Sequence, residues 1–210
     1  MRCFTNSCSE PHFVKGLDEL DRTHVVNANF IYDLPFGRQG GKLTQNALGG
    51  WHLSGVYFAR SGAPLSVTSA VDTAGVGVGL GPQTWNIVGD LAAMGSQGVG
   101  KPWFNPASFA RPAAGTFGNA GLGIIRGPSF KNLDLAVFKD FKVSERLTAQ
   151  FRAESFDLAN HPFLANPGID PTSPATFGIV TSKGGTSVAG SGSAASASQR
   201  NMQIALKLRF

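Results

Sequence analysis

Apolar and polar residues alternate with a period of two along five long segments of the chain. These segments are residues 24–34, 51–60, 132–140, 147–158 and 200–210. Successive side chains of a β-strand point to opposite faces, so the pattern predicts strands with one apolar and one polar face. The sequence contains no heptad and no helical stripe of apolar residues. It therefore predicts an all-β fold, in which the strands form an antiparallel meander.

The last two segments show the alternation most clearly. In the fourth segment the two sets are Leu147, Ala149, Phe151 and Ala153 against Thr148, Gln150, Arg152 and Glu154. In the fifth segment they are Met202, Ile204, Leu206, Leu208 and Phe210 against Asn201, Gln203, Ala205, Lys207 and Arg209. A soluble antiparallel sheet with one wet face also alternates in this way, so further evidence is needed to choose between water and lipid.

Strand length and connection length favour a transmembrane barrel over a soluble sheet. The segments are about ten to twelve residues long, and a tilted strand needs about 9–11 residues to cross a bilayer. The connections alternate between shorter (36–49 and 142–146) and longer (62–130 and 159–198). Outer-membrane barrels have short periplasmic turns and long extracellular loops. With 142–146 as a periplasmic turn, the final strand runs inward and Phe210 lies at the periplasmic rim.

In a barrel, the polar positions of each strand are expected to face away from lipid. An Arg or Lys on the lipid side would cost about 2–4 kcal/mol at the bilayer midplane. We therefore expect the polar side chains Arg152, Glu154, Lys207 and Arg209 to line the lumen. Trp51 and Tyr57, on the apolar parity, are candidates for an aromatic girdle, with plain packing as the alternative.

Composition agrees with a β-rich chain that exposes little charge. The sequence has 210 residues, including 27 Gly and 12 Pro, and only 15% of its residues are charged. No stretch is apolar enough for a membrane-spanning helix, and the first residues resemble no secretory signal. A location beyond the inner membrane would then require a true N-terminus upstream of Met1. The net charge of +5 is scattered without a basic stripe, so no nucleic-acid partner is expected.

Candidate chemistry is sparse. Cys3 and Cys8 lack a second pair of ligands for zinc, which leaves a local disulfide or two idle thiols. The four histidines are not spaced as metal ligands, and the glycine-rich stretch 75–81 lacks the phosphate-binding pattern. The low-complexity stretch 184–198 is expected to be a mobile external loop. The sequence predicts no catalytic residue, no cofactor and no metal, and hence no enzyme.

Several short motifs occur in a fixed order between residues 17 and 210. They are Asp21–Val25, Tyr32–Gly37, Trp103–Phe109, Gly118–Gly121, Arg126–Pro128, Asn132–Asp134, Phe138–Phe141, Phe151–Glu154 and Asn160–Pro162. This series resembles the late barrel of TonB-dependent outer-membrane receptors that carry a carboxypeptidase-regulatory-like domain at their N-terminus. The chain end also resembles the assembly signal of bacterial outer-membrane barrels, carried here by Ile204, Leu206, Leu208 and Phe210.

The resemblance implies a plugged barrel of 22 strands that takes up large ligands with energy from the TonB system. Residues 17–210 would be the C-terminal part of that barrel, and residues 1–16 are unassigned. The implied location is the bacterial outer membrane. The implied partners are membrane lipid, the barrel-assembly machinery and, through upstream regions only, the TonB system, while the ligand is unknown. The chain would be a truncated gene product or a partial reading frame.

Five to seven strands cannot close a barrel of that size. We therefore expect an open meander in sequence order, with residues 147–158 beside 200–210 and residues 24–34 at the far edge. A ladder between the first and last segments would instead indicate a small closed barrel. The alternative interpretation is a secreted adhesive or carbohydrate-binding β-sandwich with a binding face made of long loops.

Overall fold

The computed structural model describes residues 16–35, 41, 49–77, 83–91, 98–144, 147–184 and 200–210. The chain divides into two compact units. The sheet unit comprises the described residues within Val25–Arg60, Phe130–Pro162 and Gly185–Phe210. The loop unit comprises those within Met1–His24, Ser61–Ser129 and Phe163–Gly184.

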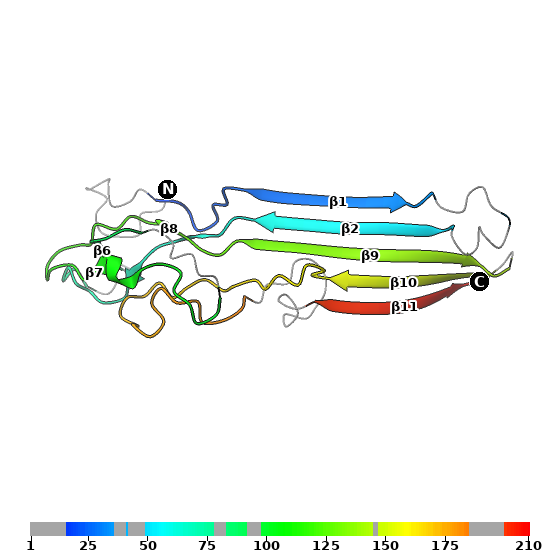
Figure 1. Cartoon of the computed structure of the whole chain (residues 1–210). Helices are drawn as coiled ribbons and strands as arrows, with labels where there is room; N and C mark the ends of the chain where they lie inside the picture. The colour runs from blue at the N-terminus through cyan, green and yellow to red at the C-terminus, as the bar shows by residue number, and fades with distance from the viewer. Residues whose placement is uncertain are drawn as a thin grey trace. The chain divides into compact units, whose positions relative to one another are not determined.

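The sheet unit is built on five long strands, drawn as neighbouring arrows in Figure 1. They are β1 (Val25–Asp33), β2 (Trp51–Arg60), β9 (Phe130–Lys142), β10 (Thr148–Phe156) and β11 (Asn201–Arg209). Each of the five predicted segments therefore forms a strand. Three strands have nine residues, slightly fewer than expected, whereas β9 has 13. β10 ends early because Asp157 adopts a positive φ of 50°, which directs the backbone out of the sheet.

The strands follow one another across the sheet in the order β1-β2-β9-β10-β11, and every neighbouring pair is antiparallel. The predicted meander is thus confirmed, with β10 beside β11 and β1 at the far edge. Among the described residues no ladder joins β1 to β11, so the sheet is open. The antiparallel directions place both long connections, between β2 and β9 and between β10 and β11, at the same end of the sheet. The β9–β10 turn at the other end is closed by the Val143 N–H, which donates to the Leu147 carbonyl at 3.0 Å.

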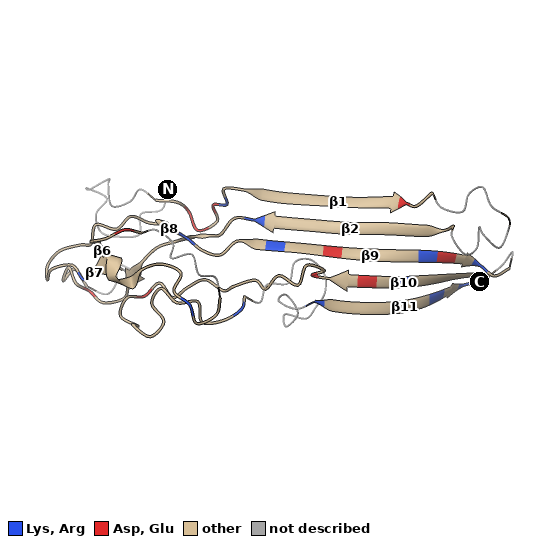
Figure 2. Ribbon diagram, viewed as in Figure 1, with Lys and Arg blue, Asp and Glu red and all other residues tan. Residues whose placement is uncertain are grey.

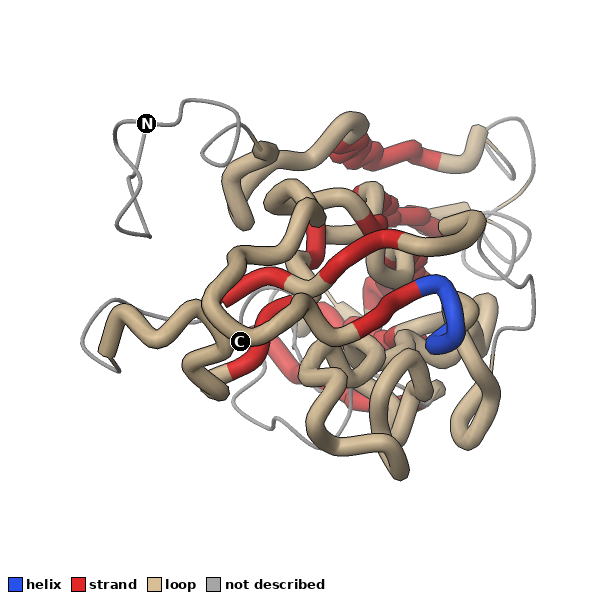
Figure 3. Tube along the Cα trace, turned by 90° about the vertical axis from the view of Figure 1, so that its left-hand side faces the viewer, coloured by secondary structure: helices blue, strands red, loops and turns tan. Residues whose placement is uncertain are grey.

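The long connections contain ordered structure of their own, in addition to the five long strands. Three two-stranded ladders form in the loop unit. They pair β3 (Pro64–Leu65) with β8 (Ile125–Arg126), β4 (Thr68–Ser69) with β5 (Gln83–Thr84), and β6 (Asn86–Ile87) with β7 (Phe109–Ala110). The 3-10 turn Pro106–Ser108 precedes β7 and is drawn in blue in Figure 3.

An aromatic cluster holds the loop unit together. Phe104, Phe109 and Phe177 are buried, and their ring centroids lie 5.3–5.7 Å apart in edge-on geometry. Such pairs contribute about 0.5–1.5 kcal/mol each beyond the burial of their area. Val67, which is fully buried, belongs to the unit as well. The loop unit therefore has its own hydrophobic core.

Within the described residues the only helical element is the 3-10 turn, and none is a candidate membrane-spanning helix. Two sequence-based predictions fall outside the described residues. One concerns the Cys3 and Cys8 thiols. The other concerns the low-complexity stretch, of which only Gly184 is described.

Candidate functional site

The ladder register assigns each alternating set to a face of the sheet. Residues paired across a ladder point to the same side, and Val26 pairs with Ala59, Leu53 with Val137, and Ala153 with Ile204. Even positions of β1 and β11 therefore share one face with odd positions of β2, β9 and β10. We call this the apolar face and the opposite side the polar face. The five separate alternations of the sequence thus combine into one two-sided sheet.

The apolar face exposes large hydrophobic side chains. On β11 the relative exposures are 73% for Met202 and Ile204 and 66% for Leu206. Phe30 and Tyr32 on β1 are also exposed. Exposed large apolar side chains gathered on one face are typical of contact with a membrane or a partner. The residues predicted as an assembly signal, Ile204, Leu206, Leu208 and Phe210, lie on or directly after β11 with the parity of this face.

The polar face carries a belt of polar side-chain contacts that crosses all five strands. His52 on β2 contacts Asp33 on β1 through Nδ1 at 2.6 Å and Asp140 on β9 through Nε2 at 3.5 Å. Gln150 on β10 donates from Nε2 to Asp140 Oδ1 at 2.9 Å. Arg209 on β11 donates to Gln150 Oε1 at 3.5 Å. One polar residue from each strand thus contributes to this belt.

A second polar group lies on the same face further along β10. The Arg152 guanidinium donates to the Glu154 carboxylate and lies 4.8 Å from the centre of the Phe138 ring. Gln203 on β11 donates to the other Glu154 oxygen. Arg152, Glu154, Lys207 and Arg209 all lie on this face, so their side chains can point into one common environment. That this environment is the lumen of a barrel remains a prediction.

The distribution of charge separates the two faces further. In the five long strands all four carboxylates, those of Asp33, Asp134, Asp140 and Glu154, lie on the polar face. Figure 2 shows these strand carboxylates in red and the cations in blue. The apolar face carries two lysines within the same strands, Lys131 and Lys139, toward opposite ends of β9.

Lys139 is one of two exceptions to the expected lipid-facing pattern, and its surroundings explain how its charge is accommodated. The side chain is 1% exposed, and its ammonium donates to the Gly49 carbonyl. Its Nζ lies 5.5 Å from the centre of the Trp51 ring and 5.1 Å from that of Phe141. Aromatic faces and a carbonyl oxygen together compensate a cation that is removed from water. Trp51, a predicted girdle residue, therefore covers a buried charge.

The alternation alone did not identify His52, Asp33 or Asp140 as a group. Each of these residues occupies a polar position in the alternation of its own segment, and this position is the signal that the sequence offers. The register that joins them was not available, since β2 and β9 are neighbours across a connection of many residues. Sequence analysis therefore found the face but not the belt.

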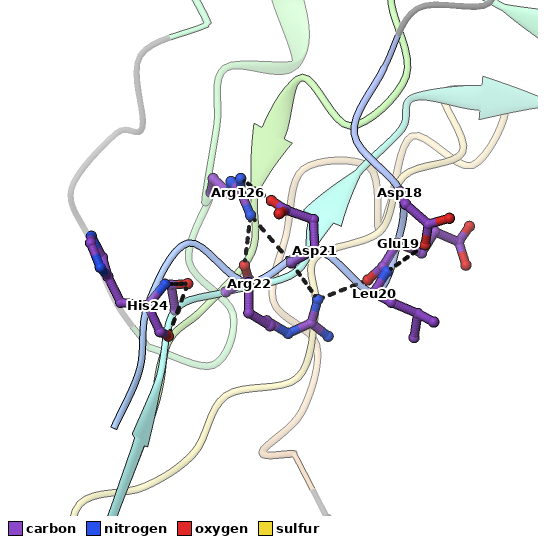
Figure 4. Close-up of polar contacts among 9 residues, drawn as sticks. Asp18, Glu19, Leu20, Asp21, Arg22, His24 and Arg126 are labelled. Atoms are coloured by element: carbon purple, nitrogen blue, oxygen red, sulfur yellow. Dashed lines mark hydrogen bonds and ion pairs between the residues drawn. The ribbon is translucent and has the colours of Figure 1, made fainter. Parts of the chain in front are cut away.

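Three of the sequence motifs meet in the loop unit, as Figure 4 shows in part. Arg126 Nη2 donates to Asp21 Oδ2 at 2.5 Å, and its Nη1 lies 3.4 Å from the carbonyls of Asp21 and Gly62. Trp103 Nε1 donates to the Arg126 carbonyl at 2.7 Å. Residues of the motifs that begin at Asp21, Trp103 and Arg126 thus make contacts that join distant segments of the chain.

An acidic loop in the same unit is held by its own backbone. The Asp72 carboxylate accepts the N–H groups of Gly77 at 2.6 Å and Val76 at 3.2 Å, and Gln83 Nε2 at 2.6 Å. The hydrogen bond from Gly77 is the main cause that holds the pKa of Asp72 below its usual value of 3.8, although partial desolvation acts against it. Both oxygens serve the loop itself, which indicates a structural role.

No group of three or more His, Cys, Asp or Glu side chains suited to a metal ion occurs among the described residues. In the comparisons with known proteins, residues 4–203 match the family model described as Outer membrane beta barrel domain. No curated protein and no solved structure matches the chain.

Proposed function

Because the chain belongs to the outer membrane β-barrel domain family, and so to the bacterial outer membrane, we propose that it is part of the barrel of a TonB-dependent receptor. In this proposal it forms the C-terminal strands of a longer protein that takes up a large ligand. Uptake would be driven by the TonB system through a plug and coupling segment encoded upstream. The chain contributes barrel wall and external surface.

The observation that carries the proposal is the open, two-faced, five-stranded sheet. Because the strand number is odd, the edge strands β1 and β11 run in the same direction. Bacterial single-chain barrels are antiparallel throughout and have an even number of strands. An odd number of further strands between β11 and β1 would preserve that pattern. If several copies of this sheet built the barrel in one membrane orientation, β11 of one copy would lie parallel to β1 of the next. Because such barrels are antiparallel throughout, this supports a barrel completed by further strands of one longer chain.

The motif series supports the receptor type within the family. Its members occur from residue 21 to residue 162 in the order expected of the late barrel of TonB-dependent receptors. Both long connections leave the same end of the sheet and contribute to the compact loop unit. With the β9–β10 turn on the periplasmic side, this unit is extracellular and is available to contact the ligand.

The partners follow from the two faces. The apolar face would contact outer-membrane lipid, and the polar face would line the lumen. The barrel-assembly machinery would recognise the terminal strand through Ile204, Leu206, Leu208 and Phe210. The alternative of a secreted β-sandwich would bury one face of this sheet against a second sheet, whereas Met202, Ile204 and Leu206 are mostly exposed.

The test is a binding experiment on the complete gene product. The reading frame upstream of Met1 is first extended, and the complete protein is purified in detergent. We expect it to encode a plug and a coupling segment and to retain the periplasmic domain of TonB on an affinity column. The matched control is the same protein without its coupling segment. An extended gene that lacks a plug, or equal retention of both proteins, would overturn the proposal.

A further inference from the structure

The apolar face carries an exposed cation at the end of the sheet from which the long connections leave. Lys131 is the second residue of β9 and pairs with Ala59 on β2, a position that the register assigns to the apolar face. The residues that follow Lys131 on the same face of β9 are the apolar Leu133, Leu135 and Val137. Lys131 therefore lies between an apolar stretch of the strand and the connection between β2 and β9.

The surroundings of Lys131 differ from those of Lys139, the other lysine of this face. The Lys139 ammonium is buried, and aromatic rings and a carbonyl of this chain compensate its charge. No described carboxylate forms an ion pair with Lys131, and no described aromatic ring lies against its ammonium. The four carboxylates of the long strands lie on the opposite face. Within the described structure the ammonium thus has no internal counter-charge and is available to an external anion.

Tyr57 on β2 is a neighbour of Lys131 on the same face. Tyr57 pairs with Leu133 while Ala59 pairs with Lys131, so Tyr57 and Lys131 are diagonal neighbours across the two strands. Such neighbours lie about 7–8 Å apart, within reach of aromatic and long side chains. Tyr57 is exposed, with an apolar ring and a polar hydroxyl, and Lys131 has an apolar stem and a charged end. Both side chains suit the boundary between membrane hydrocarbon and lipid headgroups.

We propose that Lys131 binds the phosphate group of a lipid in the outer leaflet, with Tyr57 beside the same headgroup and acyl chains over Leu133 and Leu135. Phosphate is the anion that a membrane surface offers to a cation, and each Lys or Arg near an anionic surface strengthens association about fivefold. A phosphorylated glycolipid is favoured over a zwitterionic phospholipid, because the ammonium of the zwitterion already neutralises its phosphate. The inference rests on the proposed function, which assigns this face to lipid and this end of the sheet to the outer side.

The test is local photocrosslinking in the complete protein, reconstituted in phosphatidylethanolamine vesicles. Ala59→p-benzoylphenylalanine places a photoreactive group opposite Lys131 on the same face. The vesicles contain a small share of lipid A that is radiolabelled in its acyl chains and is used either with its phosphates or after their removal. We expect the phosphorylated lipid to crosslink about fivefold more than the dephosphorylated lipid. Lys131→Gln should abolish this difference.

The matched control is Lys142→Gln, which removes an exposed lysine of the same strand from the polar face. It should leave the preference for the phosphorylated lipid unchanged. Both variants should keep the protease resistance of the folded protein, because neither lysine forms an ion pair with a described residue. Equal crosslinking of the two lipids, a preference that survives Lys131→Gln, or an equal loss in Lys142→Gln would overturn the inference. Retention by TonB is measured separately, so failure of this contact is distinguishable from failure of the proposed function.

Discussion

The ammonium of Lys139 on β9 lies 5.5 Å from the centre of the Trp51 ring on the neighbouring strand β2. The pair sits on the apolar face, where the register also aligns Phe151 and Leu206 with it. The charge is tolerated there because the Gly49 carbonyl and the Phe141 ring complete its surroundings. The pair lies in the part of β9 that is opposite the long connections.

Reversing this charge should destabilise the protein in the membrane. Lys139→Glu places a carboxylate between two aromatic rings and against a carbonyl oxygen, with no donor in exchange. We expect a loss of about 2 kcal/mol or more in the free energy of unfolding, measured by urea denaturation in lipid vesicles. The control is Lys142→Glu on the same strand, whose exposed side chain lies on the polar face. Equal losses for both variants would contradict the role assigned to the Trp51 pair.

The facing of β11 can be tested with two adjacent residues. Ile204 is 73% exposed on the apolar face, whereas Ala205 lies on the polar face opposite Arg152. Arginine at position 204 would enter lipid and cost about 2–4 kcal/mol near the midplane. Ile204→Arg should therefore reduce the folded protein in outer-membrane fractions and its protease resistance far more than Ala205→Arg. The reverse order would mean that the faces are assigned the wrong way round.

The sequence predicted the strands and their order because the signals involved are local. Each strand carries its own alternation, and the short β9–β10 turn leaves little freedom in how these two strands pair. Even the open edge could be anticipated, since five strands are too few to close a large barrel. The prediction that β1 lies at the far edge required only that neighbours in sequence remain neighbours in the sheet.

The side-chain partnerships could not be predicted, because they depend on register. His52 reaches Asp140 only because Trp51 pairs with Lys139, and one residue of slip would place these side chains on opposite faces. The folded core of the loop unit was also missed. Phe104 and Phe177 are far apart in sequence and belong to different connections, so no local pattern links them.

Acid should loosen the loop that Asp72 organises. The pKa of this carboxyl is lowered in the folded chain, so its contribution to stability is present above the unfolded value of 3.8 and is lost as pH falls through the lower folded value. We expect amide exchange at Gly77, relative to the intrinsic rate at each pH, to increase below about pH 4. Asp72→Asn should flatten this pH dependence. A pH response that is unchanged in Asp72→Asn would show that another group controls the loop.

The last residue offers a test of the assembly signal that does not depend on the interior of the sheet. Phe210 is 96% exposed and directly follows β11, which pairs with β10 alone among the described strands. Removing Phe210 therefore breaks no packing contact of the folded sheet, and its thermodynamic stability should change little. Recognition during assembly, by contrast, would lose the terminal aromatic ring. Deletion of Phe210 from the complete protein should lower its level in outer-membrane fractions at equal synthesis, measured by pulse labelling, while Phe210→Trp restores it. Normal membrane levels after the deletion would mean that the terminal ring has no part in recognition.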